Sequence, residues 1–323
     1  LMPHTIAEKI IAQAANRDTV SPGEIVTCVV DLAMIHDSGG PRRVKPILDR
    51  LKVGVWDASK IVLISDHYAP CVDAESAAIL KLTREWAEKH GIKNFYDQQG
   101  ICHVVTPERG HLRPGMFAVG GDSHSPTGGA FGAYMFGIGA TDMAGVLATG
   151  NTWIRVPHTI SINWTGAMGE GVAAKDMALK MCAVLGMDGG DYQAIQYTGK
   201  AVKSLDMMER MTLCNMAAEL GAQTGIIEPD EVTTHYLVEA GVVPGEWQIF
   251  ESDPEAEYLR VHEFNGDTLE PQVAAPNSPS NTSNVSDADK VDIDQFYIGA
   301  CTGAKLSDLK MVASVLKLSL IHI

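Results

Sequence analysis

Acidic, imidazole and thiol side chains recur in this sequence directly after apolar runs of strand character. Three groups share that position: Asp66-His67 after residues 61–64, Asp122-Ser123-His124-Ser125 after residues 116–119, and Cys301 after residues 296–299. A fourth apolar run, residues 25–30, leads toward His36 and Asp37. In open α/β sheets, ligand sites lie beyond the carboxyl ends of the strands. We therefore expect these groups to face one cavity.

The residue types suit proton transfer beside a metal. A carboxylate fixes the tautomer of a neighbouring imidazole and raises its pKa, which makes the imidazole a general acid near neutral pH. Cys301 lies in a predicted turn before a helix, and a thiol at the amino end of a helix ionises more readily. The thiolate is the form of cysteine that ligates a metal. The sequence therefore predicts acid–base chemistry close to a metal.

Each group taken by itself has an ordinary explanation. A single Asp-His dipeptide is more often a surface or capping pair, and a lone cysteine in a Gly-Ala-Cys-Thr turn is more often a packed residue. A mononuclear metal hydrolase with Asp66, His67, Asp122 and His124 as ligands is a further alternative. Only the repetition at successive strand ends favours one shared site.

Glycine is concentrated between residues 120 and 150, but its spacing is not that of a phosphate loop. Gly137 and Gly139 lack the third glycine of a dinucleotide fingerprint. The pair Gly199-Lys200 lacks the Ser or Thr that follows in a P-loop. Nucleotide binding is therefore weakly supported.

The elements that must position these residues alternate between strand and helix patterns, which predicts an α/β fold with largely parallel sheets. Two further strands are predicted, at residues 102–105 and 159–164. Helices are predicted at residues 76–90, 174–185 and 205–220, and Gly91 is a plausible C-cap of the first.

The chain divides into successive predicted units. We expect an α/β domain at residues 1–157 with the Asp and His motifs, a second at 158–273, and a linker rich in Pro, Ser and Asn at 274–290. Residues 291–323 would begin a third α/β domain. That domain is expected to be truncated, because one strand and one helix cannot bury a core. Residues 318–323 do not continue the helical pattern and suggest a non-native tail.

Composition excludes several classes of function. The 323 residues carry 25 Lys and Arg against 40 Asp and Glu, a net charge of −15, which disfavours binding to nucleic acid or to anionic membranes. No apolar run approaches the roughly 18–20 residues of a membrane helix, and no secretory signal is visible. Six cysteines without a C-x-x-C pair indicate a reducing compartment. We expect a cytoplasmic protein.

Five ordered motifs resemble the aconitase superfamily as far as about residue 317. The motifs occupy residues 100–108 (GICHVVTPE), 121–127 (GDSHSPT), 137–144 (GIGATDMA), 210–219 (RMTLCNMAAE) and 298–303 (IGACTG). The resemblance is nearest to the large subunits of 3-isopropylmalate dehydratase, homoaconitase and dimethylmalate dehydratase. It implies an aconitase-like fold and a hydro-lyase acting on a hydroxy di- or tricarboxylic acid. Isopropylmalate is favoured, with homoaconitate, dimethylmalate and citrate as alternatives.

The resemblance also implies a [4Fe–4S] cluster held by three cysteine thiolates, with one open iron acting as a Lewis acid. Cys301 matches the first ligand, and the C-x-x-C pair that supplies the other two is absent from this sequence. Such a chain is expected to be inactive alone. A catalytically incompetent fragment that keeps the fold is therefore the competing hypothesis, and a C-x-x-C pair in the downstream coding sequence would decide against it.

Further roles are carried over by resemblance. Asp66 and His67 match the pair that protonates the leaving hydroxyl, His103 and Asp122 match a second carboxylate–imidazole pair, and His124 matches an imidazole near the iron-bound oxygen. The implied substrate contacts are Ser123, His36 and Gln196. Gln196 stands where the family has a Glu that partners His124, and an amide cannot stabilise a protonated imidazole as a carboxylate does.

The residue that removes the carbon-bound proton has no match in this sequence. In the family it is a Ser on a swivelling domain, which in two-subunit members is a separate small subunit. The resemblance therefore implies a small-subunit partner.

Overall fold

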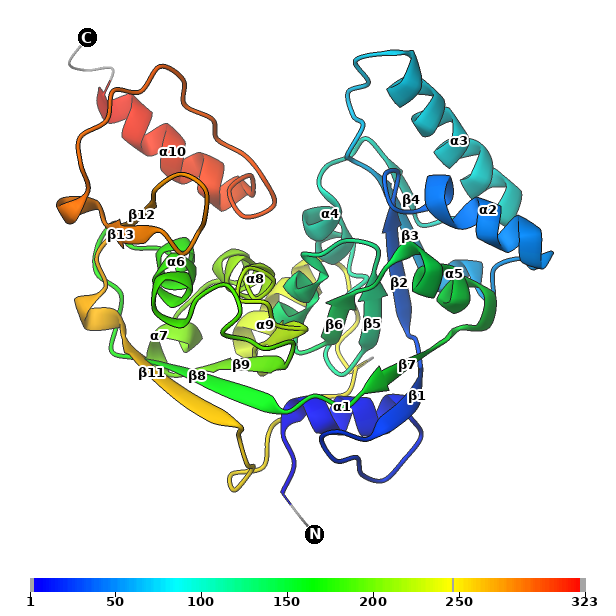
Figure 1. Ribbon diagram of the computed structural model, residues 1–323, viewed down its shortest axis with the longest axis horizontal. Helices are drawn as coiled ribbons and strands as arrows, with labels where there is room; N and C mark the ends of the chain where they lie inside the picture. The colour runs from blue at the N-terminus through cyan, green and yellow to red at the C-terminus, as the bar shows by residue number, and fades with distance from the viewer. Residues whose placement is uncertain (1–2, 246, 320–323) are drawn as a thin grey trace.

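The computed structural model describes residues 3–245 and 247–319 and is built around two parallel sheets (Figure 1). The first has the strand order β4-β3-β2-β5-β6, and the second has the order β10-β9-β8-β11. All neighbouring strands within each sheet are parallel, which confirms the predicted fold class. Their bounds are β2 Leu32–His36, β3 Ile61–Ser65, β4 Phe95–Asp97, β5 Phe117–Gly120, β6 Tyr134–Gly137, β8 Thr159–Thr165, β9 Ala194–Thr198, β10 Thr224–Ile226 and β11 Arg260–Asn265.

Helices cover these sheets, and the two faces of the first sheet belong to different cores. Alternate residues of the strands contact α1, α2, α3 and α5 on one face, whereas the other face shares a core with α6, α8 and the second sheet. The helix bounds are α1 Ile6–Ala14, α2 Pro41–Leu51, α3 Ala74–His90, α4 Cys102–Glu108, α5 Ala140–Thr149, α6 Ala174–Leu185, α7 Lys200–Lys203, α8 Met207–Asn215, α9 Glu231–Glu239 and α10 Leu306–Ser319. Among the described residues, short 3₁₀ segments occur at η1 Ala58–Lys60, η2 Ser125–Phe131, η3 Gly266–Thr268 and η4 Val285–Asp287.

Each parallel sheet lies on its own side of the boundary expected after residue 157. One hydrophobic cluster crosses that boundary, however, and joins Met34 and Val62 of the first sheet to Ile160 and Trp164 of the second. The domain limits therefore stay a prediction.

Two antiparallel ribbons accompany the sheets. β1 (Ile25–Val29) pairs with β7 (Asn151–Arg155), so the predicted strand at 25–30 lies outside the parallel sheet that it was expected to join. The strand that leads to His36 is instead β2. β12 (Gln272–Ala274) pairs with β13 (Thr282–Asn284) inside the segment expected to be a linker, and the backbone N–H of Gln272 donates to Asp176 of α6 at 2.7 Å.

The strand predicted at residues 102–105 is wrong, because these residues begin the helix α4. The Asp66 carboxylate accepts a hydrogen bond from the backbone N–H of Cys102 at 2.7 Å and so satisfies a free donor at the helix start. The apolar, β-branched sequence of residues 102–105 gives no sign that a distant carboxylate caps them. Tertiary context overrides the local preference here.

The strand predicted at residues 296–299 is also wrong. This stretch has no regular structure and lies beside no strand among the described residues, while Phe296 and Tyr297 are 75% and 79% exposed. The helix predicted at 205–220 ends earlier, as α8 at Asn215. The helix α10 runs on through Ser319, so the expected tail begins inside a helix, and residues 320–323 lie outside the described residues.

The remaining sequence predictions of elements hold. The helix predicted at residues 76–90 is α3, and Gly91 is its left-handed C-cap at φ +66°. The strand at 159–164 is β8, and the helix at 174–185 is α6. In the described part of the chain, no helix combines the length and the apolar character that crossing a bilayer requires.

A close backbone approach holds the loop after β5 in place. That loop continues into η2, where the backbone N–H of Ile227 donates to the Gly129 carbonyl at 3.0 Å. A Cβ atom at Gly129 would lie 1.7 Å from the carbonyl oxygen of Gly225 in β10. Only glycine allows the two units to approach this closely.

Gly129→Ala should therefore lower the free energy of unfolding by about 3 kcal/mol, the upper range for overpacking. The matched control is Gly145→Ala in α5, where a Cβ meets nothing within 4 Å and a helical alanine is favourable. Chemical denaturation measures the free energy of unfolding of both variants. Equal stability of the two variants would contradict the proposed role of Gly129.

Candidate active site

The expected Asp and His groups meet at one edge of the first parallel sheet. β3, β2 and β5 are consecutive neighbours in this sheet, so their carboxyl ends lie side by side. β2 ends at His36, β3 is followed by Asp66-His67, and β5 is followed by Gly121 and Asp122-Ser123-His124. The structure thus brings together the strand ends that the sequence singled out.

The Asp122 carboxylate is the centre of this group. Its Oδ1 accepts hydrogen bonds from His103 Nε2 and from the His124 backbone N–H, each at 2.8 Å. Its Oδ2 lies 3.6 Å from His67 Nε2 and 3.7 Å from His36 Nε2. Burial alone would raise the pKa of Asp122, but the hydrogen bonds from His103, His124 and His67 hold it well below its usual range. Asp122 is therefore an anion at any physiological pH.

His67 lies between two carboxylates. Its Nδ1 is 2.7 Å from Asp66 Oδ1, and its Nε2 faces Asp122. The contacts with the Asp122 and Asp66 carboxylates outweigh burial and raise the pKa of His67 to about 10. The side chain keeps 37% exposure, so its protonated ring is open to a ligand. His67 has the geometry and the charge of a general acid.

His36 stacks on His67 but carries no charge. The two rings are 3.9 Å apart at an angle of 10°. His36 Nδ1 accepts from the Gly39 backbone N–H at 3.2 Å, and Nε2 then donates to the Gly121 carbonyl at 3.0 Å. Burial and the neighbouring His67 cation lower the pKa of His36. Because both ring nitrogens already bind backbone groups, its expected contact with substrate stays a prediction.

The expected neighbour of His124 is wrong. His124 Nε2 lies 3.1 Å from Glu219 Oε1, beyond the end of α8, and not beside Gln196. Gln196 is buried, and its amide donates to Glu228 at 2.9 Å while its carbonyl accepts from Ser252. Hydrogen bonds to Asp122 and Glu219 raise the pKa of His124, so a carboxylate does support its protonated form.

Ser123 lies next to this imidazole. Its hydroxyl is 3.2 Å from His124 Nδ1, and it lines a cavity of 420 Å³ together with Asp122. A hydroxyl there can contact a ligand that also reaches Asp122. Its role in substrate binding remains a prediction.

Cys301 is joined to the acid–base group through hydrogen bonds. Its Sγ lies 3.6 Å from Asn215 Oδ1, and the Asn215 amide donates to Thr127 Oγ1 at 2.8 Å. Thr127 Oγ1 in turn donates to the His124 carbonyl at 2.7 Å. The expected effect of a helix amino end is wrong, because α10 begins only at Leu306 and burial raises the pKa of Cys301.

A metal ion bound directly by the Asp and His cluster is disfavoured. Single ligand atoms of His36, Asp37, Asp66 and His67 lie within 4.8 Å of one another. Most of these atoms are already committed: the Asp37 oxygens accept from the backbone N–H groups of Ser38, His67 and Tyr68, and Asp66 holds His67 and Cys102. Hydrogen bonds within the protein therefore explain the cluster. It shares only Asp66 and His67 with the ligand set of the hydrolase alternative, because Asp122 and His124 lie outside it.

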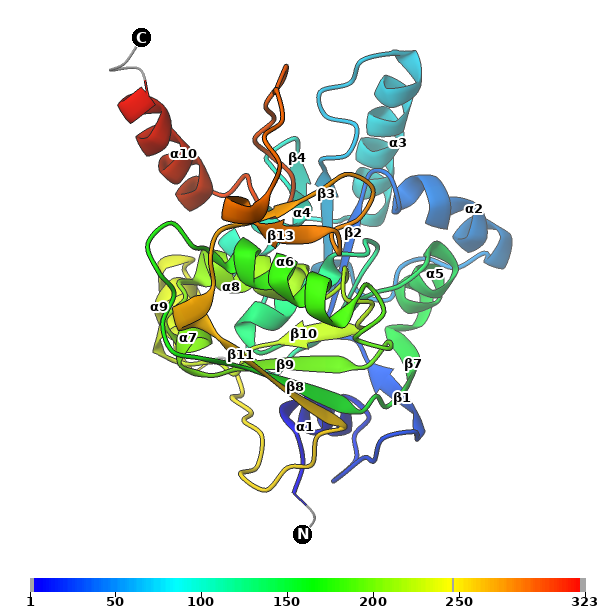
Figure 2. The same ribbon diagram turned by 60° about the vertical axis from the view of Figure 1, so that its left-hand side comes forward.

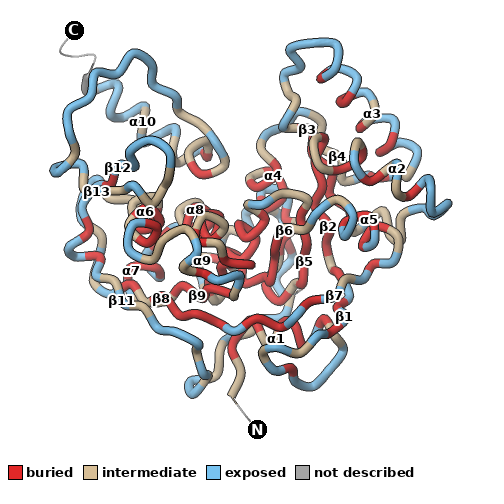
Figure 3. The backbone as a smooth tube through the Cα atoms, in the orientation of Figure 1, coloured by how far each residue is buried: buried red, intermediate tan, exposed pale blue. Residues whose placement is uncertain are grey.

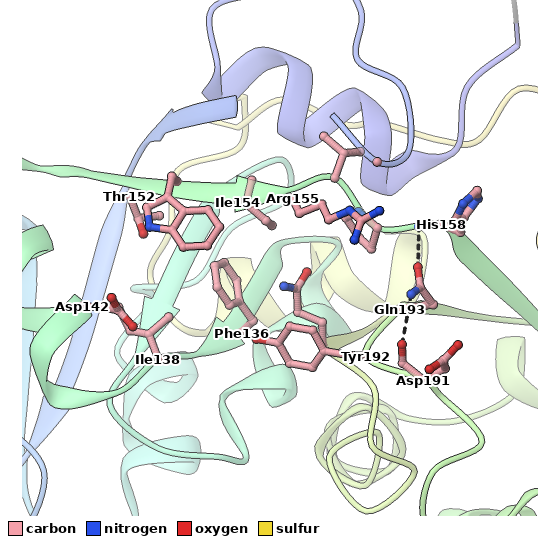
Figure 4. Close-up of a pocket in the computed structure, with 15 residues that line it drawn as sticks. Phe136, Ile138, Asp142, Thr152, Ile154, Arg155, His158, Asp191, Tyr192 and Gln193 are labelled. Atoms are coloured by element: carbon pink, nitrogen blue, oxygen red, sulfur yellow. Dashed lines mark hydrogen bonds between the residues drawn. The ribbon is translucent and has the colours of Figure 1, made fainter. Parts of the chain in front are cut away.

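Two cavities adjoin at this face of the molecule. The 420 Å³ cavity contains Asp122 and Ser123, and a larger one of 560 Å³ lies beyond Tyr192 (Figure 4). Ile138, Tyr192 and Gln223 line both. The smaller cavity is the candidate site for substrate, because the larger one contains none of the acid–base residues.

Sequence reasoning missed Glu219 and Asn215 as members of the site, and it named Asp37 without a role. Glu219 and Asn215 lie within the motif at residues 210–219, four positions apart, which was a usable signal. The buried Arg210 anchors α8 through two hydrogen bonds of 2.7 Å to Asp230 and so fixes the position of both. Asp37 directly follows His36 but acts on backbone N–H groups, which no residue pattern reveals.

Comparison with known proteins places these motifs in a family. The profile of the aconitase family (aconitate hydratase) matches residues 8–290. The chain is 45% identical over 322 residues to 3-isopropylmalate dehydratase large subunit 1 of Methanopyrus kandleri, covering 99% of this chain and 76% of the relative. It is 43% identical over 316 residues to the probable methanogen homoaconitase large subunit of Methanothermobacter thermautotrophicus, covering 96% and 73%.

A solved structure shows a weaker likeness. Aconitase X of Thermococcus kodakaraensis in its holo form is 12% identical, with a TM-score of 0.42, over 75% of this chain and 58% of that one.

The charge state of His67 can be measured directly. We predict a doubly protonated His67 ring and a neutral His36 ring at pH 7.5, read from ¹⁵N chemical shifts of the imidazoles. Asp122→Asn removes one of the two anions and should lower the pKa of His67. The folded pKa lies above the unfolded value of about 6.5, so this stabilisation is complete below that pH and is lost as the pH rises toward 10. A neutral His67 at pH 7.5 would refute the assignment.

The partner of His124 can be tested with two substitutions. Glu219→Gln should lower the pKa of His124, because it removes the carboxylate at 3.1 Å. Gln196→Glu should leave that pKa unchanged and should destabilise the fold, because it places a second carboxylate beside Glu228. The same NMR titration reads both variants. The opposite pattern would restore residue 196 as the partner.

Proposed function

The chain belongs to the aconitase family and is a dehydratase-like hydro-lyase, and from that premise we propose that it is the large subunit of an enzyme that reversibly dehydrates 3-isopropylmalate. The observation that carries this proposal is the His67 imidazole, which lies between the carboxylates of Asp66 and Asp122, the second of which lines the cavity that contains Ser123. The names of the most similar relatives supply the substrate. We place the reaction in the cytoplasm.

Dehydration requires an acid for the leaving oxygen. A base removes the carbon-bound proton, the electron pair becomes the C=C bond, and the C–O bond breaks with its electrons on oxygen. His67 gives its proton to that oxygen, so water departs rather than hydroxide. Asp66 and Asp122 favour the protonated form of His67, so the ring takes up a proton again after water leaves. Hydration is the reverse sequence.

The other site residues orient this step. His103 holds Asp122 in place, and Asp122 in turn binds the turn at His124 through its backbone N–H. We assign His124, supported by Glu219, and the Ser123 hydroxyl to the oxygen atoms of the substrate. Ser123 lines the 420 Å³ cavity, and its hydroxyl lies 3.2 Å from the His124 ring, which supports this role.

Cys301 fits one thiolate ligand of a [4Fe–4S] cluster. It is a free thiol, half-buried, and connected to the acid–base group through Asn215 and Thr127. When bound, the cluster would supply a Lewis-acid iron for the substrate hydroxyl. Holding the cluster takes two further thiolates in addition to Cys301.

A small-subunit partner completes the proposal. The relatives are named large subunits, and we assign the base that removes the carbon-bound proton to their partner. The partner should therefore cover the cavity that contains Asp122 and Ser123.

Homoaconitate is the second candidate substrate, because a relative with 43% identity is named a homoaconitase large subunit. The two candidates separate when a large subunit that carries all three cluster thiolates, reconstituted anaerobically with the small subunit, is supplied with each acid in turn. Higher kcat/KM for isopropylmalate supports the first proposal. Higher kcat/KM for homoaconitate would replace it, and no turnover of either acid would refute it.

In that complex, His67→Gln should lower kcat for dehydration by about 10²–10⁴-fold, the usual contribution of general acid–base catalysis. The absorbance of the unsaturated product follows the reaction. His235→Gln on α9, a site 77% exposed, is the matched control and should retain full activity. If His67→Gln kept activity, another residue would have to protonate the leaving oxygen.

A further inference from the structure

The segment that carries Cys301 is attached to the rest of the molecule in an unusual way. In residues 281–317, all of which the structure describes, the only buried residues are Thr302 and Lys305. Most apolar side chains of this segment are exposed, including Phe296, Leu306 and Val315. In both views α10 stands off from the sheets (Figures 1 and 2), and Figure 3 shows its backbone as mostly exposed. Polar contacts therefore hold the segment in place.

Lys305 makes the central contact. Its side chain is 1% exposed, and its ammonium donates to Thr212 Oγ1 on α8 at 2.8 Å and to the Thr302 carbonyl at 3.2 Å. Asp308 Oδ2 lies 2.9 Å from the same nitrogen and also accepts from the Lys305 backbone N–H. An ammonium has three donors, and all three have partners here.

Thr302 forms the second attachment. Its hydroxyl accepts from the Lys175 ammonium of α6 at 2.9 Å, while its carbonyl accepts from Lys305. Two lysines from different parts of the chain therefore donate hydrogen bonds to one residue. That residue directly follows Cys301 in the sequence.

The turn directly before these contacts has a strained backbone. Ala300 adopts φ +67°, a left-handed conformation that costs a non-glycine residue about 1 kcal/mol or more. Such a conformation persists only where the surroundings impose it. The lysine contacts lie directly after it and supply that constraint.

We propose that Lys305, together with Thr212, is a positioning residue that holds the Cys301 thiol toward the acid–base group before any metal is bound. Burial of a lysine is costly unless each of its donors has a partner, and an apolar side chain at this position would lack that cost. The directional contacts of Lys305 instead fix the turn on α8. The same helix carries Asn215, which meets the Cys301 sulfur.

The purpose assigned to Cys301 rests on the proposed function, but the positioning itself does not. The test therefore measures the turn in the chain as described above, without cluster or substrate. Failure of this test would leave the hydro-lyase proposal intact. Failure of the activity test would likewise leave the positioning of Cys301 by Lys305 and Thr212 intact.

The experiment compares Lys305→Met, Lys305→Arg and Thr212→Val with Lys310→Met, which changes an exposed lysine on α10. Hydrogen exchange is measured for residues 299–305. Alkylation of Cys301 is measured relative to the exposed Cys71 in the same molecule. Lys305→Met and Thr212→Val should each raise both rates about tenfold, the effect of losing a hydrogen bond to a charged group. Lys305→Arg should restore much of the protection, and Lys310→Met should match the parent chain.

Thr212→Val preserves the charge of Lys305, so its alkylation rate reports access to the thiol rather than a change in its ionisation. The melting temperature should stay within a few degrees in every variant. Rates in Lys305→Met and Thr212→Val that equal those in Lys310→Met would overturn the proposal. If Lys305→Met unfolds the chain, the exchange and alkylation rates of Thr212→Val decide, again by comparison with Lys310→Met.

Discussion

The site depends on one half-buried anion, the Asp122 carboxylate. Isolated in the protein interior it would be strongly unfavourable, and imidazole and backbone donors offset that cost. The same charge then determines its surroundings: it holds the ring of His103, fixes the turn at His124 and favours the protonated form of His67. Removal of this one charge would change the fold of the loop and the chemistry of the acid together.

The parallel sheet places this anion where it can act. Three neighbouring strands end at one edge, and each contributes one part of the cluster. The close approach of Gly129 to Gly225 locks the loop after β5 against the second sheet. A path of hydrogen bonds through Thr127 and Asn215 then reaches Cys301. The acid–base group and the thiol thus belong to one continuous polar network.

Much of this arrangement follows from local patterns in the sequence, and the failures share a cause. The α/β class, the helices α3 and α6 and the position of Asp66-His67 after a strand were predictable, because periodicity and strand ends are local properties. The helix α4 was not, because its cap is a carboxylate 36 residues away. Glu219 replaced Gln196 beside His124 for a similar reason, since only the packed fold shows which acid faces the imidazole. The resemblance to a family supplied roles but not this pairing.

The central claim is that His67, held protonated by Asp122, supplies the proton in dehydration. The most direct measurement is the pH dependence of kcat/KM for dehydration by the complex with its small subunit, in the parent enzyme and in Asp122→Asn. Activity should decline only on the alkaline side of neutrality, where His67 loses its proton, and the alkaline limb should move to lower pH in the variant. An alkaline limb at the same pH in both enzymes would contradict the claim.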